Sequence, residues 1–515
     1  MHSALHTVTQ YHSNKHGKHG IVRSALVLHG NDLGYRVVRG AKFTILGIVL
    51  RTLITLGSVS ILARLLSPAD FGYMAMATIV TELAALFGNF GFASVLIQKR
   101  VITRLQMDTV FWASALLGLA LTLTILVLSY FATWFFGEPT AGQLMRIMCL
   151  TFAIDGLVTV HGALISRLMK FYTDFWIQII TIAFRTAVAI VLAWQGFGVW
   201  SLVIGSLAGS ALHLLLSISI IPYWPRLKFN LSYLRSTWKT NSSYFAGGLL
   251  FYANTNVDLL LIGRMVGATA LGYYQNARSL TDEVRYRIAV PLQRVLFPAF
   301  SSLQDNISRL QDTVLRSGRL LAAIVFPVGI GIAATANELV PILYGEKWLA
   351  MIPVLKLLGI STALKGSTAI AIPLFNAANR VGLALRYNII GTIIVVLCVV
   401  AASPWGIVAV AGAIALSALY SVFSFRVALG LIGLGWRSVG SMLAPPLLAS
   451  TIMWIAIEIA RALLAGQLAG GVSLALHIAL GIIVYPVALA LLSPTILVDL
   501  KAVLAKMRPT SSQSR

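Results

Sequence analysis

Residues 255–281, TNVDLLLIGRMVGATALGYYQNARSLT, repeat at a spacing of 200 the pattern of residues 55–81, TLGSVSILARLLSPADFGYMAMATIVT. The identical pairs are Thr55 and Thr255, Arg64 and Arg264, Gly72 and Gly272, Tyr73 and Tyr273, Ala77 and Ala277, and Thr81 and Thr281, and Glu82 is followed at the same spacing by Asp282. Internal repeats in membrane proteins are typical of two structurally related lobes. The repeat therefore predicts that residues 271–297 form a copy of the apolar segment at residues 71–97.

The composition indicates a membrane protein with many spans. Hydrophobic residues make up 58% of the 515 residues, and charged residues only 11%. Such a composition is typical of polytopic membrane proteins rather than soluble domains. The two cysteines, Cys149 and Cys398, lie in apolar stretches and predict neither a disulfide framework nor a metal cluster. The first 40 residues lack the apolar core of a secretory signal, so we expect the first span to direct insertion.

Thirteen apolar stretches are long enough to cross a bilayer, since about 20 residues are needed. Their approximate ranges are 43–63, 71–97, 109–133, 142–165, 174–194, 197–221, 242–263, 316–336, 350–376, 387–403, 405–425, 440–460 and 472–492. The segment 271–297 is too polar to join them by hydropathy, and only the repeat indicates that it spans.

The distribution of Lys and Arg favours fourteen spans over thirteen, because these residues collect in cytoplasmic loops. Fourteen spans with the N-terminus inside place 26 Lys and Arg on the cytoplasmic side and five outside, whereas thirteen spans place 17 on each side. The sequence therefore predicts an all-α integral membrane protein with 14 transmembrane helices and both termini cytoplasmic. The net charge of +23 is then largely an orientation signal, and no nucleic-acid partner is needed to explain it.

A second, shorter repeat defines the lobes: Gly198 and Val199 near the sixth span correspond to Gly406 and Ile407 near the twelfth. Two lobes of six spans each would share one orientation, related by an axis along the membrane normal, and would surround a central cavity. The predicted organisation is a disordered basic, His-rich cytoplasmic tail at 1–40, an N-lobe at 41–221, a cytoplasmic linker at 222–241, a C-lobe at 242–430, spans 13 and 14 at 431–495, and a cytoplasmic tail at 496–515. The basic tail is expected to contact anionic lipid.

Three stretches, ARLLSPADFG at 63–72, NFGFASVLIQK at 89–99 and NVDLLLIGRMVGATALGYY at 256–274, resemble the Wzx-type polysaccharide repeat-unit flippases. The resemblance is closest to the branch that handles colanic-acid-like and succinoglycan-like exopolysaccharides, in the superfamily that also holds multidrug exporters of the MATE type. It covers roughly residues 40–495. What it implies is a transporter in the bacterial inner membrane, serving exopolysaccharide or lipopolysaccharide biosynthesis, that carries a polyprenyl-diphosphate-linked oligosaccharide across by alternating access.

The resemblance also implies partners, namely membrane lipids, the lipid-linked oligosaccharide, and a polysaccharide polymerase with its export machinery. A MATE-like multidrug exporter on the same fold is the alternative function. A site for cationic drugs should be acidic and aromatic, whereas the isolated ionisable residues within these spans lean basic. A membrane enzyme is disfavoured because the longest external loop, residues 337–349, is too short for a catalytic domain.

Ionisable residues inside spans cost several kcal/mol unless they face a cavity or a partner. Asn276, Glu283, Arg287 and Arg294 follow one another at steps of seven, four and seven, which places them within about 40° on one helix face. We expect this polar stripe to line the cavity. Glu283 and Arg287 could instead form a purely structural pair. Arg294 has no acidic residue one turn away, and a guanidinium binds a diphosphate well.

Three further cations are candidates for the cavity. Arg51 and Arg185 fall near the middle of the first and fifth spans, and the competing explanations are snorkelling or ion pairs with Glu82 or Asp155. Lys365 shares a helix face with two hydroxyl residues, Ser361 and Thr368, and is therefore expected to face the cavity.

Asp258 lies in the seventh span, within a segment that matches the family pattern closely. No cofactor is expected, but by analogy with the exporters of the superfamily Asp258 could bind a coupling proton or sodium ion. The alternative is a buried hydrogen bond or ion pair that holds the lobes together. The same two roles apply to Glu82, Asp155 and Glu283.

Overall fold

The computed structural model describes residues 33–88, 92–99, 101–464, 470–496 and 498–499. Within these residues the chain forms helices and no β-strands, so the predicted all-α class is confirmed. Twelve helical segments in this part of the chain are long and apolar enough to cross a membrane. Helices α11 (Leu231–Met265) and α12 (Ala268–Ser301) have the length but are more polar, so the full count of 14 spans stays a prediction.

The chain divides into two compact units, residues 1–66 with 76–253 and residues 67–75 with 254–515. The division between residues 253 and 254 falls inside α11, a single helix that contributes residues to both units. Two element boundaries differ from those expected: α3 begins at Leu33, before residue 41, and α11 begins at Leu231, within the expected linker. The tail at residues 1–32 and most of 496–515 lie outside the described residues.

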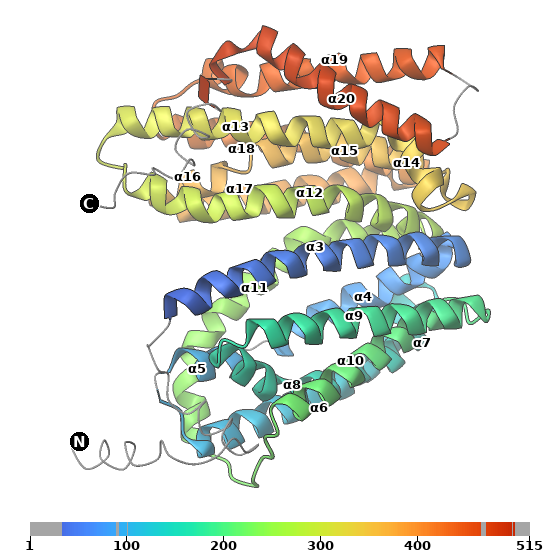
Figure 1. Cartoon of the computed structure of the whole chain (residues 1–515), viewed down its shortest axis with the longest axis vertical. Coiled ribbons are helices and arrows are strands. Elements are labelled where there is room, and N and C mark those ends of the chain that lie inside the picture. The colour runs from blue at the N-terminus through green and yellow to red at the C-terminus, as the bar shows by residue number, and fades with distance from the viewer. Residues whose placement is uncertain (1–32, 89–91, 100, 465–469, 497, 500–515) are drawn as a thin grey trace. The chain divides into compact units, whose positions relative to one another are not determined.

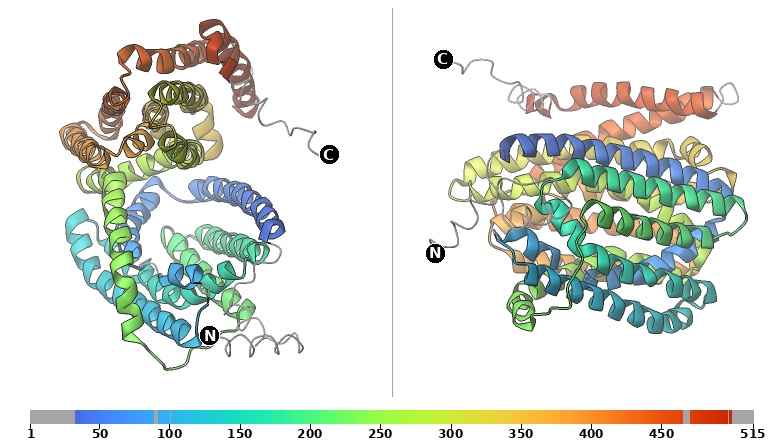
Figure 2. Two further views of the ribbon diagram at one scale, coloured as in Figure 1. Left: turned by 90° about the vertical axis from the view of Figure 1, so that its left-hand side faces the viewer. Right: turned by 60° about the horizontal axis from the view of Figure 1, so that its bottom comes forward.

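The helices of the first unit mostly run side by side in roughly parallel or antiparallel directions, whereas α11 crosses the others (Figures 1 and 2). They are α3 (Leu33–Leu65), α4 (Pro68–Gly88) from residue 76 onward, α5 (Phe92–Gln98), α6 (Arg104–Phe136), α7 (Pro139–Met148), α8 (Leu150–Arg167), α9 (Phe171–Trp194), α10 (Trp200–Ile220) and α11 up to residue 253. Helix α9 packs between α3 and α10, and α6 packs on α8. The expected fourth span is built from α7 and α8 together.

Small residues allow α6 and α8 to approach closely. A Cβ added at Gly118 would lie 2.4 Å from the Phe152 carbonyl oxygen, and one added at Gly156 would lie 2.6 Å from the Ser114 carbonyl oxygen. Without a hydrophobic force between helices in lipid, such close backbone contact is a main source of helix association in membranes.

The loop after α10 is tied back to the start of α6. The buried Tyr223 hydroxyl donates to the carboxylate of Asp108, which also accepts from the backbone N–H of Arg226 at 3.2 Å. Burial, and secondly the bond to Asp108, raise the pKa of Tyr223, so its hydroxyl keeps the proton that it donates. Trp112 adds a bond from its indole nitrogen to the Arg226 carbonyl oxygen at 2.9 Å.

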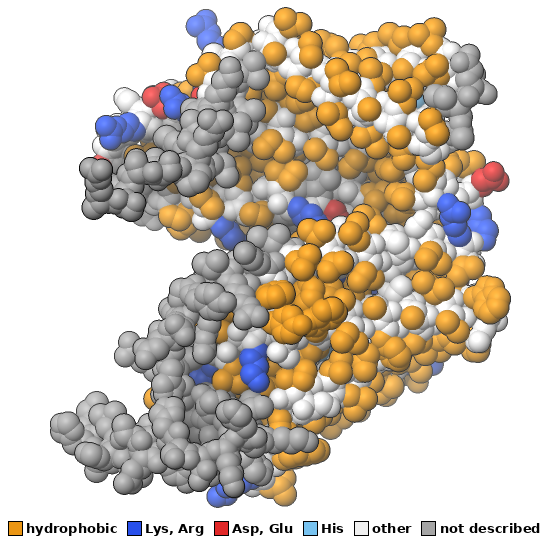
Figure 3. Space-filling model, viewed as in Figure 1, with side chains coloured by type: hydrophobic (Ala, Val, Ile, Leu, Met, Phe, Trp, Pro, Cys, Tyr) orange, Lys and Arg blue, Asp and Glu red, His pale blue; other side chains and the backbone are white. Residues whose placement is uncertain are grey.

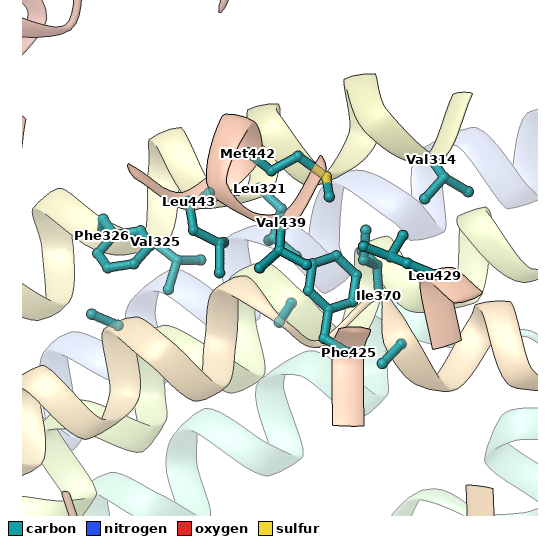
Figure 4. Close-up of a cluster of buried hydrophobic side chains, with 14 of the residues drawn as sticks. Val314, Leu321, Val325, Phe326, Ile370, Phe425, Leu429, Val439, Met442 and Leu443 are labelled. Atoms are coloured by element: carbon teal, nitrogen blue, oxygen red, sulfur yellow. The ribbon is translucent and has the colours of Figure 1, made fainter. Parts of the chain in front are cut away.

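The second unit contains residues 67–75, the last part of α11, and all later helices. These are α12 (Ala268–Ser301), α13 (Ile307–Ala334), α14 (Ala336–Leu343), the 3-10 turn Glu346–Trp348, α15 (Met351–Ser367), α16 (Ala371–Ala377), α17 (Val381–Ala402), the 3-10 turn Ser403–Trp405, α18 (Ile407–Gly430), α19 (Trp436–Leu463) and α20 (Gly470–Leu492). Helix α13 packs against α15 and α19, and its Val325 and Phe326 belong to the buried apolar cluster that also includes Phe425 and Met442 (Figure 4).

The two last helices, α19 and α20, both contact Glu338 of α14 through polar side chains. Arg461 of α19 binds Glu338 of α14 at 2.7 Å and Glu458 at 2.5 Å, and His477 of α20 lies 3.3 Å from the same Glu338 carboxylate. Elsewhere these helices expose apolar side chains, including Ile455 of α19 (Figure 3). An exposed apolar surface is what a helix in contact with lipid requires.

Two glycines of the repeat, Gly72 and Gly272, each pack against the helix that carries the other, and both belong to the second unit. A Cβ added at Gly72 of α4 would lie 1.8 Å from the carbonyl oxygen of Ala268, and one at Gly272 of α12 would lie 1.9 Å from the carbonyl oxygen of Pro68. Positions 68 and 268 are themselves 200 residues apart, so the contact is reciprocal. The repeat thus marks a symmetric close approach of two helix starts that only glycine allows.

Replacing Gly72 or Gly272 with alanine is expected to lower the thermal unfolding temperature of the purified protein. Overpacking costs about 1–3 kcal/mol where side chains can adjust, and here the obstacle is backbone. Gly57→Ala is the matched control, because Gly57 is also helical but has nothing within 4 Å of the added Cβ. Equal unfolding temperatures for Gly72→Ala, Gly272→Ala and Gly57→Ala would contradict the packing described.

Candidate functional site

A polar cavity of about 280 Å³ opens within the second unit, between α11, α12 and α15–α18. Its lining combines hydroxyl and amide side chains, four aromatic rings and four charged residues. The side chains concerned are Ser361, Thr362, Thr368, Ser417, Ser421, Ser424, Thr255, Thr281, Asn254 and Asn388, then Tyr274, Phe375, Tyr387 and Tyr420, and finally Asp258, Arg278, Asp282 and Lys365. A pocket with convergent polar groups and aromatic walls is the usual form of a ligand site.

Arg278 is the centre of the charged wall. Its guanidinium binds Asp258 at 2.9 Å and Asp282 at 3.0 Å, and it also donates to the backbone carbonyl of Thr255. Only 14% of its side chain is exposed, against 13% for Asp258 and 20% for Asp282. A guanidinium cannot lose its proton in a protein, so it can be buried only where carboxylates and carbonyls surround it.

The hairpin between α11 and α12 brings these groups together. Gly267 adopts a φ of 101°, a conformation that favours glycine, and lets the chain reverse directly into α12. Asp258 before the turn then faces Tyr274 and Arg278 after it. The Tyr274 hydroxyl donates to Asp258 at 2.7 Å, and the Leu259 N–H donates to the same carboxylate at 2.9 Å.

The first copy of the repeat lacks this network. Positions 58, 78 and 82 correspond to 258, 278 and 282, and they hold Ser58, Thr78 and Glu82. Instead of an ion pair, the Ser58 hydroxyl lies 2.9 Å from that of Thr186 on α9. The charge asymmetry between the copies is therefore centred on the buried Arg278.

Lys365 lines the cavity from α15, on the same face as Ser361 and Thr368. The hydroxyl of Thr368, the residue after α15, donates to that of Ser421 on α18 at 3.1 Å, which links the two helices at the cavity wall. Of the cations expected near a substrate, Lys365 is the one placed in this cavity.

The expected polar stripe of α12 is divided in the structure. Asn276 is buried and its amide donates to the Gly272 carbonyl at 3.0 Å, whereas Glu283, Arg287 and Arg294 are exposed. Glu283 and Arg287 form an ion pair one turn apart. None of these three exposed residues is among those that line the cavity of the second unit.

The remaining candidates lie in the first unit. Arg51 of α3 donates to the side chain of Gln178, whose amide in turn donates to Asp174 at 2.6 Å on α9. Arg185 of α9 is exposed, and its Cβ would lie 2.9 Å from a Cβ added at Gly209 of α10. Asp155 of α8 and Glu82 of α4 are both exposed. Arg51 therefore has Gln178 as its partner, which sequence reasoning did not propose.

Sequence reasoning missed Arg278, Asp282 and Tyr274 as site residues. Arg278 lies inside α12 and is largely buried. A usable signal was present: Arg278 and Asp282 stand four residues apart, the spacing of a helical ion pair. The missing information was that Asp258, on the preceding helix, meets the same face.

Residues 61–353 match the model of a family described as polysaccharide biosynthesis proteins, and this chain belongs to that family. Among its relatives, the lipopolysaccharide biosynthesis protein WzxC of Escherichia coli (strain K12) is 26% identical over 72% of this chain and 75% of its own length. The succinoglycan biosynthesis transport protein ExoT of Rhizobium meliloti (strain 1021) is 26% identical over 61% of this chain and 64% of its own length, slightly less than two thirds.

Two solved structures have a fold similar to that of this chain. The lipid II flippase MurJ, in an inward closed conformation, superposes with a TM-score of 0.69 over 88% of this chain and 98% of MurJ, at 17% identity. An inward-facing MATE family multidrug transporter of the MOP superfamily gives a TM-score of 0.57 over 74% of this chain and 94% of its own, also at 17% identity. At such identities the likeness concerns the fold alone.

Two ion pairs on α12 allow a matched comparison of burial. Arg278→Met should leave two carboxylates without their cation and lower the free energy of unfolding by about 3–5 kcal/mol, the usual cost of breaking a buried pair. Arg287→Met removes the exposed Glu283 pair and should cost at most about 1 kcal/mol. Thermal unfolding in detergent compares the two variants directly. Equal losses would show that the Arg278 network is no more important to the fold than the surface pair.

Proposed function

We propose that this protein is a flippase that moves a polyprenyl-diphosphate-linked oligosaccharide repeat unit across the bacterial inner membrane by alternating access. The observation that carries the proposal is the family match, which covers more than half of the chain. It is supported by the fold, which superposes on a lipid II flippase over 88% of the chain. The product would serve exopolysaccharide or lipopolysaccharide biosynthesis.

The physical problem is to carry sugars and a diphosphate across about 30 Å of hydrocarbon while the polyprenyl tail stays in lipid. A polar cavity inside a helical unit meets this requirement, because it replaces water around the head group. We propose that five cations act as contacts for the substrate head group: Arg294, Arg287, Arg51 and Arg185 for the diphosphate, and Lys365, which lines the cavity, for the part of the head group next to it. Guanidinium and ammonium groups are the natural ligands of phosphate oxygens.

For Asp258 the geometry favours ion pairing over ion coupling. Its carboxylate already accepts from Arg278, Tyr274 and a backbone N–H, so a coupling ion would have to displace bonds that are made. Asp155 and Glu82 are exposed and remain the better candidates for a coupling proton or sodium ion, while Glu283 is paired with Arg287.

A MATE-like exporter of organic cations is the alternative function. In its favour, two carboxylates and four aromatic rings line the cavity. Against it, Arg278 and Lys365 line the same cavity and offset both carboxylates, which leaves no net attraction for a cationic drug. The proposed partners are the lipid-linked oligosaccharide, membrane lipids, and a polymerase with its export machinery, and both termini are proposed to be cytoplasmic.

Deletion of the gene is expected to abolish surface polysaccharide and to leave lipid-linked repeat units on the cytoplasmic leaflet. Extraction and mass spectrometry of the lipid fraction, with and without the plasmid-borne gene, measure the accumulation. Unchanged surface polysaccharide in a strain with no second transporter of this family would overturn the proposed function.

Arg294→Ala is expected to reduce export at least tenfold at unchanged protein level, because a phosphate contact is lost, and Arg294→Lys should retain part of the activity. Arg309→Ala, an exposed arginine of α13 that follows the Asn306 helix cap, is the control. Export by Arg294→Ala at the level of this control would remove Arg294 from the site.

A further inference from the structure

We propose that the polar cavity of the second unit is a sugar-binding subsite, which takes one ring of the oligosaccharide while the diphosphate is held elsewhere. The inference rests on the proposed function and adds that the sugar and the diphosphate of the head group bind at separate places. The volume of about 280 Å³ supports a small occupant, since it is just below the 300–1,000 Å³ typical of small-molecule pockets. Such a cavity has room for a single ring rather than a whole repeat unit.

The charge of the cavity favours a neutral polyol over a diphosphate or a metal cation. Arg278 and Lys365 balance Asp258 and Asp282, so the formal charge of the lining is zero. The guanidinium is already shared between both carboxylates, and a metal ion would have to expel it. A sugar hydroxyl, in contrast, both donates and accepts, and can add to such a network without breaking it.

The hydroxyl lining offers acceptors in particular. The Ser421 and Ser417 hydroxyls donate to carbonyls of their own helix, at 2.6 Å and 2.7 Å, and Thr368 donates to Ser421 at 3.1 Å. Their protons are thereby used, while each oxygen keeps lone pairs that can accept further hydrogen bonds. These oxygens are suited to accept hydrogen bonds from the several O–H groups of a sugar ring.

A sugar ring also needs an apolar surface for its C–H face, and the aromatic rings of Phe375, Tyr387 and Tyr420 provide one. The ring centroid of Tyr387 is 6.0 Å from that of Phe375 and 6.3 Å from that of Tyr420, with interplanar angles of 17° and 26°. All three line the cavity. The faces of such rings are electron-rich and attract the slightly positive hydrogens of a sugar ring's C–H face.

The experiment compares two lipids on the full-length protein in nanodiscs. One is the lipid-linked repeat unit extracted from the deletion strain, and the other is undecaprenyl diphosphate, which carries no sugar. Tyr387→Ala should weaken binding of the repeat-unit lipid about tenfold, equivalent to about 1.4 kcal/mol, and leave undecaprenyl diphosphate unchanged. Tyr387→Phe keeps the ring and should restore binding.

Ser421→Ala and Ser441→Ala provide a matched pair of serines. Both hydroxyls donate to the carbonyl three residues earlier, at 2.6 Å and 2.9 Å, but only Ser421 lines the cavity while Ser441 is exposed on α19. Binding of the repeat-unit lipid should fall about threefold in Ser421→Ala and not in Ser441→Ala, with both proteins folded by thermal unfolding.

The outcomes separate this inference from the function on which it rests. If the wild type binds both lipids and the Tyr387 and Ser421 variants weaken both equally or neither, the sugar subsite is wrong and the flippase stands. If the wild type binds neither lipid, the proposed function fails and the subsite with it. Selective loss of the sugar-bearing lipid is the result that supports the subsite.

Discussion

The burial of Arg278 between two carboxylates is the constraint on which the second unit depends. A guanidinium that is always charged must find partners wherever the fold places it. Here the partners come from two helices, because Asp282 is one turn away on α12 and Asp258 is on α11. The pair therefore fixes how the two helices face each other after the turn at Gly267. The cavity, which is lined on one side by these residues, takes its shape from the same contact.

The network also explains why the two copies of the repeat cannot have the same role. Both copies begin with the same packing, since Gly72 and Gly272 each approach the backbone of the other's helix. At other positions the first copy holds uncharged Ser58 and Thr78 where the second holds Asp258 and Arg278. The symmetric positions build the scaffold, and the asymmetric ones give one copy a charged wall.

Much of the fold could be predicted from the sequence, because hydropathy and helix length follow directly from the bilayer. The repeat indicated a helix in the polar segment 271–297, and α12 covers it. The site was harder to predict. Periodicity on one helix groups Glu283, Arg287 and Arg294, but it carries no information about which face a neighbouring helix covers. Arg278 is buried because Asp258 reaches it from α11, and contacts between helices are not visible in the pattern of one helix.

The reciprocal glycine contact has a consequence for which substitutions the repeat can accept. Each glycine faces a carbonyl oxygen of the opposite helix, and every amino acid has that oxygen. The partner positions can therefore differ freely in side chain, as Pro68 and Ala268 do, while positions 72 and 272 are each restricted to the smallest residue. The two copies can therefore differ at positions 68 and 268 but not at positions 72 and 272. The symmetry of the repeat can persist in these two glycines after the surrounding sequences have become different.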